Sequence, residues 1–112
     1  MDAHLSGELA SWPTKERLAK ILCDGGLKVY VGRYSIRVEN CSRFIFQEYG
    51  GDLGDPQIDA EADTVEEMIL DGRLVSNALA RAGLVHRFEI YQDDDSEMAG
   101  YLHHKWPLEE PR

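Results

Sequence analysis

The sequence predicts an α+β fold: a two-layer sandwich in which one long and one short helix cover a five-stranded, mainly antiparallel sheet. Residues 63–83 carry apolar side chains at helical spacing, and the runs on both sides of them alternate with the period of two that strands show. Short turn sequences separate these runs. The predicted order of elements is αβββαββ, and 112 residues suit a single domain, 1–112.

The long helix 63–83 has a recognisable start and end. Asp63 and Glu66 have the spacing of a capping box immediately before the periodic run. Gly83 follows the run, where a residue in the left-handed conformation commonly ends a helix. We therefore expect one continuous helix between these signals.

The apolar stripe of this helix predicts which face it buries. It consists of Val65, Met68, Ile69, Gly72, Val75, Leu79 and Ala82. Asp71 and the other charged residues are expected on the opposite, exposed face, so the helix is interpreted as scaffold. Gly72 costs about 1 kcal/mol relative to alanine inside a helix, and we expect it to allow close approach to the sheet or to the other helix.

A short helix and three strands are predicted before the long helix. Thr14 is a suitable N-cap for an apolar-periodic run that ends at Gly25 and Gly26. Alternating runs then predict strands at 28–32, 34–40 and 43–49, joined as an antiparallel meander.

Three segments are predicted to lie outside regular structure. Residues 1–12 show no period and are expected to form a loose N-terminal arm, and 107–112 form a tail rich in Pro and acid. Residues 50–62 are expected to be a solvated loop. The alternating acidic residues that begin at Asp59 resemble a calcium loop, but the glycine and glutamate that an EF-hand requires further on are missing.

A hairpin at the end of the chain supplies the candidate ligand or proton-linked residues. Strand 85–91 and the segment 98–106 pair across the acidic turn 93–96, in a register that places His86 opposite His103. Two imidazoles on one face share a proton or a ligand readily, but zinc requires one or two further ligands, which the spacing does not supply. We predict no metal site, no cofactor and no catalytic residue.

Charge and composition restrict the partners and the compartment. The net charge is −9, and no Lys/Arg cluster is present, so neither nucleic acid nor an anionic membrane is an expected partner. The N-terminus lacks the basic and apolar parts of a signal peptide. Cys23 and Cys41 are expected to be reduced thiols, and the predicted localisation is cytoplasmic.

Aromatic residues indicate a protein interface. Two helices cannot cover both faces of a five-stranded sheet, so Tyr30, Tyr49 and Tyr91 are expected on an uncovered face, where arginine side chains also extend. Tyrosine is favoured at interfaces, and self-association as a homodimer is the expected consequence.

The sequence therefore predicts a small, acidic, cytoplasmic interaction or regulatory protein without enzymatic activity, which binds a protein partner or itself. One alternative is a small-ligand-binding protein or enzyme with a pocket between helix and sheet near His86 and His103. Another is an immunity-type inhibitor of a basic toxin, for which the net charge is the support.

Overall fold

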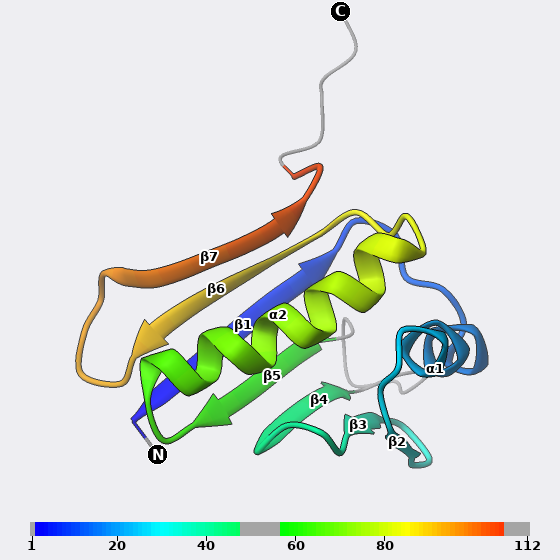
Figure 1. The fold of residues 1–112 in the computed structure, drawn as a ribbon, viewed down its shortest axis with the longest axis horizontal. Helices are drawn as coiled ribbons and strands as arrows, with labels where there is room; N and C mark the ends of the chain where they lie inside the picture. Colours follow the sequence, from blue (N-terminus) through cyan, green and yellow to red (C-terminus); the bar gives the residue numbers. More distant parts are fainter. Residues whose placement is uncertain (1, 48–56, 107–112) are drawn as a thin grey trace, which may run out of the picture.

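The computed structural model describes residues 2–47 and 57–106, which form a seven-stranded sheet and two helices (Figure 1). The strand order is β2-β3-β4-β5-β1-β6-β7, and all neighbouring strands are antiparallel. The α+β class with one long and one short helix is confirmed. The prediction of five strands is wrong, because the sheet has two more.

The strands are β1 (Ala3–Leu9), β2 (Val29–Val31), β3 (Ile36–Val38), β4 (Arg43–Gln47), β5 (Gln57–Ala62), β6 (His86–Gln92) and β7 (Met98–His104). The helices are α1 (Lys15–Asp24) and α2 (Val65–Arg81). All five predicted strands are present, and β2 and β3 are shorter than predicted. The predicted tail at 107–112 lies outside the described residues.

The segment predicted to be a loose N-terminal arm is a central strand. β1 lies between β5 and β6 and pairs with both along its length. Ala3, Leu5 and Leu9 are buried at alternate positions, as a strand with one covered face requires. The pattern is weak in the sequence because Ser6 and Gly7 interrupt it with residues of low strand propensity.

The second unexpected strand, β5, lies within the predicted loop 50–62. Its buried positions are Ile58, Ala60 and Ala62, under α2, while Asp59 and Glu61 point to the other face. Alanine is a poor strand former, but its small side chain suits a strand that a helix crosses closely. The acidic residues that resemble a calcium loop are therefore the outward half of a strand alternation.

The helix signals are largely confirmed, with a shift of one residue at the start of α2. Thr14 caps α1 by accepting a hydrogen bond from the amide of Arg17 at 3.2 Å. Thr64, rather than Asp63, caps α2 and accepts from the amide of Glu67 at 3.1 Å. Gly83 has φ +77°, as predicted for the residue after the helix.

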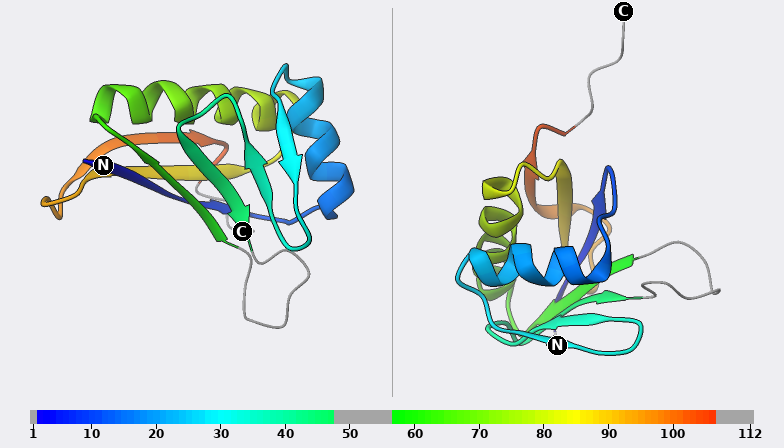
Figure 2. Two further views of the ribbon diagram at one scale, coloured as in Figure 1. Left: turned by 90° about the horizontal axis from the view of Figure 1, so that it is seen from below. Right: turned by 90° about the vertical axis from the view of Figure 1, so that its right-hand side faces the viewer.

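α2 lies across the sheet, which bends around it, and α1 packs beside α2 near β2 (Figure 2). We call the sheet face covered by α2 the inner face and the opposite one the open face. Phe44, Phe46 and Phe88 of the inner face are fully buried. A Cβ on Gly72 would lie 2.9 Å from Leu102 Cδ1, so the predicted close approach at this glycine is confirmed.

Candidate functional site

His86 lies on the inner face of β6 and is completely buried. Its Nδ1 is 2.8 Å from the carbonyl oxygen of Leu84, which can only accept a hydrogen bond, so Nδ1 carries the proton. Nε2 of the neutral ring then accepts a hydrogen bond from the Ser76 hydroxyl at 2.7 Å. Both ring nitrogens of His86 are therefore occupied.

The environment of His86 favours its neutral form. Burial lowers the pKa of the imidazole, and this is the largest cause. The neighbouring imidazoles of His104 and His103 lower the pKa further when they are charged, whereas the contact with the Leu84 carbonyl raises it. The net pKa is below the ordinary value for histidine.

The predicted pairing of His86 with His103 is wrong, because the cross-strand neighbour of His86 is His104. The two rings stack, with centroids 6.2 Å apart. A β-bulge beside Ile90 and Tyr91 adds one residue to the opposing strand, and a shift of one residue exchanges the two faces. Gly100 lies beside this bulge, and a glycine inside a strand is a common sign of one.

His103 consequently lies on the open face, opposite Arg87 and stacked on Tyr101 with ring centroids 5.1 Å apart. His86 would have to give up its bond to Ser76 to bind a ligand through Nε2. In the part of the chain that the structure describes, no group of three or more His, Cys, Asp or Glu side chains is arranged to hold a metal ion.

Two buried polar residues of α2 were assigned incorrectly or overlooked at the sequence level. Asp71 was expected at the surface but is 8 % exposed, and its carboxylate accepts a hydrogen bond from the amide of Ser42 at 3.3 Å. Burial raises the pKa of Asp71.

Ser76, also 8 % exposed, is the partner of His86. Its spacing of four from Gly72 on the predicted stripe was a signal that it faces inward.

Burial also affects one of the two cysteines, both of which are free thiols. Burial, and secondarily the neighbouring charge of Asp71, raise the pKa of Cys41 to about 12. Its Sγ lies 3.9 Å from the carbonyl oxygen of Asp71. Cys41 is therefore a packed thiol with little thiolate at neutral pH, whereas Cys23 is exposed on α1.

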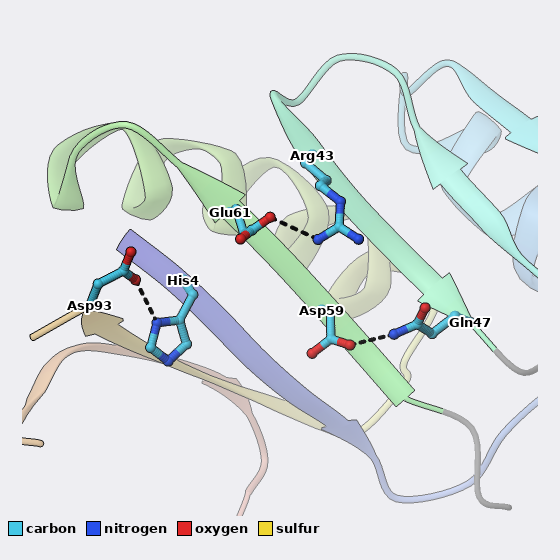
Figure 3. Close-up of polar contacts among 6 residues, drawn as sticks. All are labelled: His4, Arg43, Gln47, Asp59, Glu61 and Asp93. Carbon is cyan, nitrogen blue, oxygen red and sulfur yellow. Dashed lines mark hydrogen bonds and ion pairs between the residues drawn. The ribbon is translucent and has the colours of Figure 1, made fainter. Parts of the chain in front are cut away.

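The open face carries cross-strand pairs of polar and charged side chains (Figure 3). Arg43 of β4 contacts Glu61 of β5 at 2.9 Å, and the Gln47 amide donates to Asp59 along the same pair of strands. His4 Nδ1 lies 3.0 Å from Asp93 Oδ1. These side chains satisfy one another across strands, so the centre of the face is polar.

Arg87 continues this pattern on β6. Its guanidinium contacts Glu8 at 2.7 Å and Glu89 at 3.2 Å, and it lies over the Trp106 ring at 5.0 Å. The hydrogen bond that Arg87 donates to the Glu8 carboxylate is the main reason that the pKa of Arg87 is raised. The arginine side chains expected on this face are thus present and engaged with carboxylates.

The interface candidates occupy different surroundings. Tyr91 lies on the open face, stacked on His4 at 5.5 Å, and its hydroxyl donates to Glu89 at 3.3 Å. Tyr30 is 63 % exposed on β2, at one edge of the sheet. Tyr49 lies outside the described residues.

The exposed apolar side chains of the sheet gather at its two edges. Tyr30 and Val31 lie on the edge strand β2, and Met98 and Tyr101 lie on the edge strand β7, where they are 48 % and 39 % exposed. β2 has three residues and β7 has seven. On α2, Leu70 and Leu74 are exposed as well.

Acidic side chains gather at the end of the molecule where β1 begins. Asp93 of the β6–β7 turn donates its amide to the carbonyl oxygen of Asp2 at 2.8 Å, and the start of α2 lies at the same end (Figure 1). A pocket of about 390 Å³ there is lined in part by Asp2, Asp63 and Glu66. A second pocket, of about 620 Å³, lies elsewhere along β1 and β5, between Glu8, Trp12 and Asp59.

Comparisons with protein-family models, with curated proteins and with solved structures give no match. Neither of the two described helices is long and apolar enough to cross a membrane.

Proposed function

We propose that the protein is a small, acidic, cytoplasmic interaction or regulatory protein without enzymatic activity. It binds a protein partner through the edges of its sheet, and the first candidate for this partner is a second copy of the same chain. The distribution of exposed apolar side chains carries the proposal. The centre of the open face is occupied by paired charges, whereas Tyr30, Val31, Met98 and Tyr101 expose apolar surface on edge strands.

Edge strands have backbone amide and carbonyl groups free to pair with another chain, and natural proteins usually protect them with charges or cover them. An edge that instead exposes aromatic and thioether side chains is suited to strand addition by a partner. Free Cys23 and Cys41 agree with a reducing compartment. The full burial of His86 supports a structural rather than a catalytic part for this residue.

Light scattering over a range of protein concentrations tests the proposal, with a dimer as the expected result. Tyr30→Glu, Tyr91→Glu and Tyr101→Glu, measured separately, would identify the side of the sheet that associates. Leu74→Glu is the matched control, because Leu74 is 47 % exposed on α2, away from the sheet. A protein that stays monomeric at high concentration and has no protein partner in the cell would contradict the proposal.

A second candidate function, inhibition of a basic toxin or another basic protein, is favoured by the acidic end of the molecule. Asp2, Asp63, Glu66 and the β6–β7 turn place several carboxylates close together there. Binding through this end would weaken steeply with salt. Reversal of charge at Asp94 and Asp95, both exposed in the turn, would weaken it further, whereas binding that is insensitive to salt would exclude it.

A further inference from the structure

We propose that the protein associates with itself head to tail, so that the acidic end of one copy docks on an aromatic and basic surface at the β2–β3 hairpin of the next. The inference rests on the proposed function and identifies the two surfaces that meet. The basic one, which we call the hairpin surface, consists of Lys15, Tyr30, Arg33, Tyr34 and Arg37. The acidic end consists of Asp2, Asp63, Glu66, Asp94 and Asp95.

The hairpin surface exposes two aromatic rings. Tyr30 is 63 % exposed and Tyr34 is 49 % exposed. A Cβ on Gly32 would lie 3.9 Å from Tyr30 Cε2, so the Tyr30 ring lies beside the turn. The Arg33 guanidinium lies over the Tyr34 ring, 5.3 Å from its centroid. Tyrosine and arginine are enriched in protein interfaces and among the residues that contribute most to binding.

Three cations accompany these rings. Arg37 lies opposite Tyr30 on the open face. Lys15 Nζ donates hydrogen bonds to the carbonyl oxygens of Gly32 and Arg33 at 2.9 and 2.7 Å, which brings the start of α1 to the turn. In the part of the chain that the structure describes, no carboxylate forms an ion pair with these three cations. The hairpin surface therefore offers unpaired positive charge beside exposed aromatic rings.

The acidic end supplies the complementary charge from the same chain. Asp94 and Asp95 are exposed in the β6–β7 turn, which is joined to the start of β1 by the hydrogen bond between the Asp93 amide and the Asp2 carbonyl oxygen. Further carboxylates line the pocket beside this turn. The β6–β7 turn and the β2–β3 hairpin lie toward opposite ends of the molecule, as Figure 1 and Figure 2 show. A copy bound at one end thus leaves the other end free.

Charge favours the head-to-tail arrangement over a symmetric one. Two hairpin surfaces that face each other would bring arginine side chains together, and two acidic ends would bring carboxylates together. A contact between the unlike surfaces avoids both repulsions. Such a contact does not close on itself after two copies, so further copies add as a ring or an open chain. A dimer is the first product, and larger species follow at higher concentration.

Two charge variants test the surfaces separately. Arg37→Glu is expected to raise the Kd of self-association in sedimentation equilibrium about 5- to 30-fold. Asp94→Asn/Asp95→Asn removes charge from the acidic end and is expected to raise Kd about 3- to 10-fold. The asparagine at 95 keeps a side-chain oxygen for the Glu97 amide, which donates to Asp95 Oδ1 at 2.9 Å.

Arg73→Glu is the matched control for Arg37→Glu. Arg73 is exposed on α2, away from both surfaces, and its substitution makes the same change in net charge. Its Kd is expected to equal that of the original protein. Circular dichroism establishes that each variant is folded, and an increase in NaCl from about 50 mM to about 500 mM is expected to weaken the original association.

Mixing the two variants tests the arrangement itself. The Arg37→Glu protein keeps an intact acidic end, and the Asp94→Asn/Asp95→Asn protein keeps an intact hairpin surface, so one original contact forms between them. Isothermal titration calorimetry is expected to give a 1:1 complex with a Kd within about 2- to 3-fold of the original. In a symmetric contact that used both surfaces, the mixture would regain no affinity.

The outcomes separate the inference from the proposed function. Self-association that neither salt nor Arg37→Glu weakens would overturn the inference and leave the interaction function in place. If Arg37→Glu weakens self-association but Asp94→Asn/Asp95→Asn does not, the hairpin surface binds another part of the chain and the acidic end is excluded as its occupant. A mixture without recovery would overturn the head-to-tail arrangement. A protein that is monomeric at every concentration would exclude self-association altogether, and the proposed function would then require a different protein partner.

Discussion

The two faces of the sheet are built from the same strands, yet their side chains are held by different forces. On the inner face, Phe44, Phe46 and Phe88 are fully buried, and the Phe44 ring contacts the other two. On the open face, charged side chains pair across strands while part of each stays in water. Burial of an apolar side chain contributes about 1.5–3 kcal/mol to the free energy of unfolding. An exposed ion pair contributes only a few tenths of a kcal/mol, up to about 1 kcal/mol.

This difference predicts which face tolerates change. Inner positions are constrained by packing from both the sheet and α2, and open positions are constrained mainly by their cross-strand partner. Substitutions on the two faces of one strand therefore provide matched comparisons in the same local backbone.

The largest effect is expected on β6. Phe88→Ala removes a fully buried ring and is expected to lower the free energy of unfolding by about 3–5 kcal/mol, because the surrounding core cannot collapse into the space. Tyr91→Ala, on the open face of the same strand, is the control and should cost clearly less. Urea denaturation at neutral pH measures both. Equal losses would contradict the contrast between the faces.

A similar comparison is available on β1. A Cβ on Gly7 would lie 2.6 Å from Phe88 Cδ1 and 3.2 Å from the carbonyl oxygen of Arg87. Gly7→Ala is therefore expected to destabilise the protein by about 1–3 kcal/mol despite the better strand propensity of alanine. Ser6→Ala on the open face should change stability by no more than about 0.5 kcal/mol.

Gly7→Ala should cost less in a Phe88→Leu background, which replaces the ring that the new methyl group meets. This reduction, measured as a double-mutant cycle, assigns the cost to the contact with the ring rather than to the backbone.

The pair of His86 and Ser76 makes inner-face stability depend on pH. The pKa of His86 is lowered in the folded protein, so the unfolded chain takes up this proton first as the pH falls. The stabilising contribution of neutral, buried His86 to the free energy of unfolding is thus present above about pH 6.5. It is lost as the pH falls toward the lower pKa of the folded state, at up to about 1.4 kcal/mol per pH unit.

Urea denaturation at pH 7 and pH 5.5 measures this contribution as the difference between the original protein and His86→Phe. The loss on acidification should be smaller in the variant, and an identical loss would exclude His86 as its source. Ser76→Ala, which removes the donor to buried Nε2, should cost about 1–3 kcal/mol at pH 7.

The smallest effect is expected for the open-face pair of Arg43 and Glu61. The side chains are 40 % and 41 % exposed, so water screens their attraction. A double-mutant cycle with Arg43→Ala and Glu61→Ala is expected to give about 0.2–1 kcal/mol, decreasing with added salt. A coupling that salt does not reduce would indicate that the open face is covered in solution.

The helices illustrate what can be read from local sequence. Thr14, Gly83 and the alternation of the meander strands act over a few residues, and each is confirmed. Gly72 was also interpreted correctly, because a glycine inside an apolar stripe has few explanations other than close packing.

The candidate site was predicted less well, since its geometry depends on one residue of register. His86 and the hairpin were identified, but the bulge exchanged His103 for His104 as the neighbour. The polar network of Ser76 and His86 joins α2 to β6, and neither segment reveals the other as its partner.

By itself, the sequence determined the class of the fold, the two helices, the meander and the acidic charge, because periodicity, caps and composition are local properties. Only the tertiary structure decided that residues 3–9 form a central strand, that 57–62 form another, and that the open face is polar. β1 acquires its strand character from β5 and β6, whose paired residues lie more than fifty positions away along the chain. Contacts at such separation leave little trace in the short segments that form them.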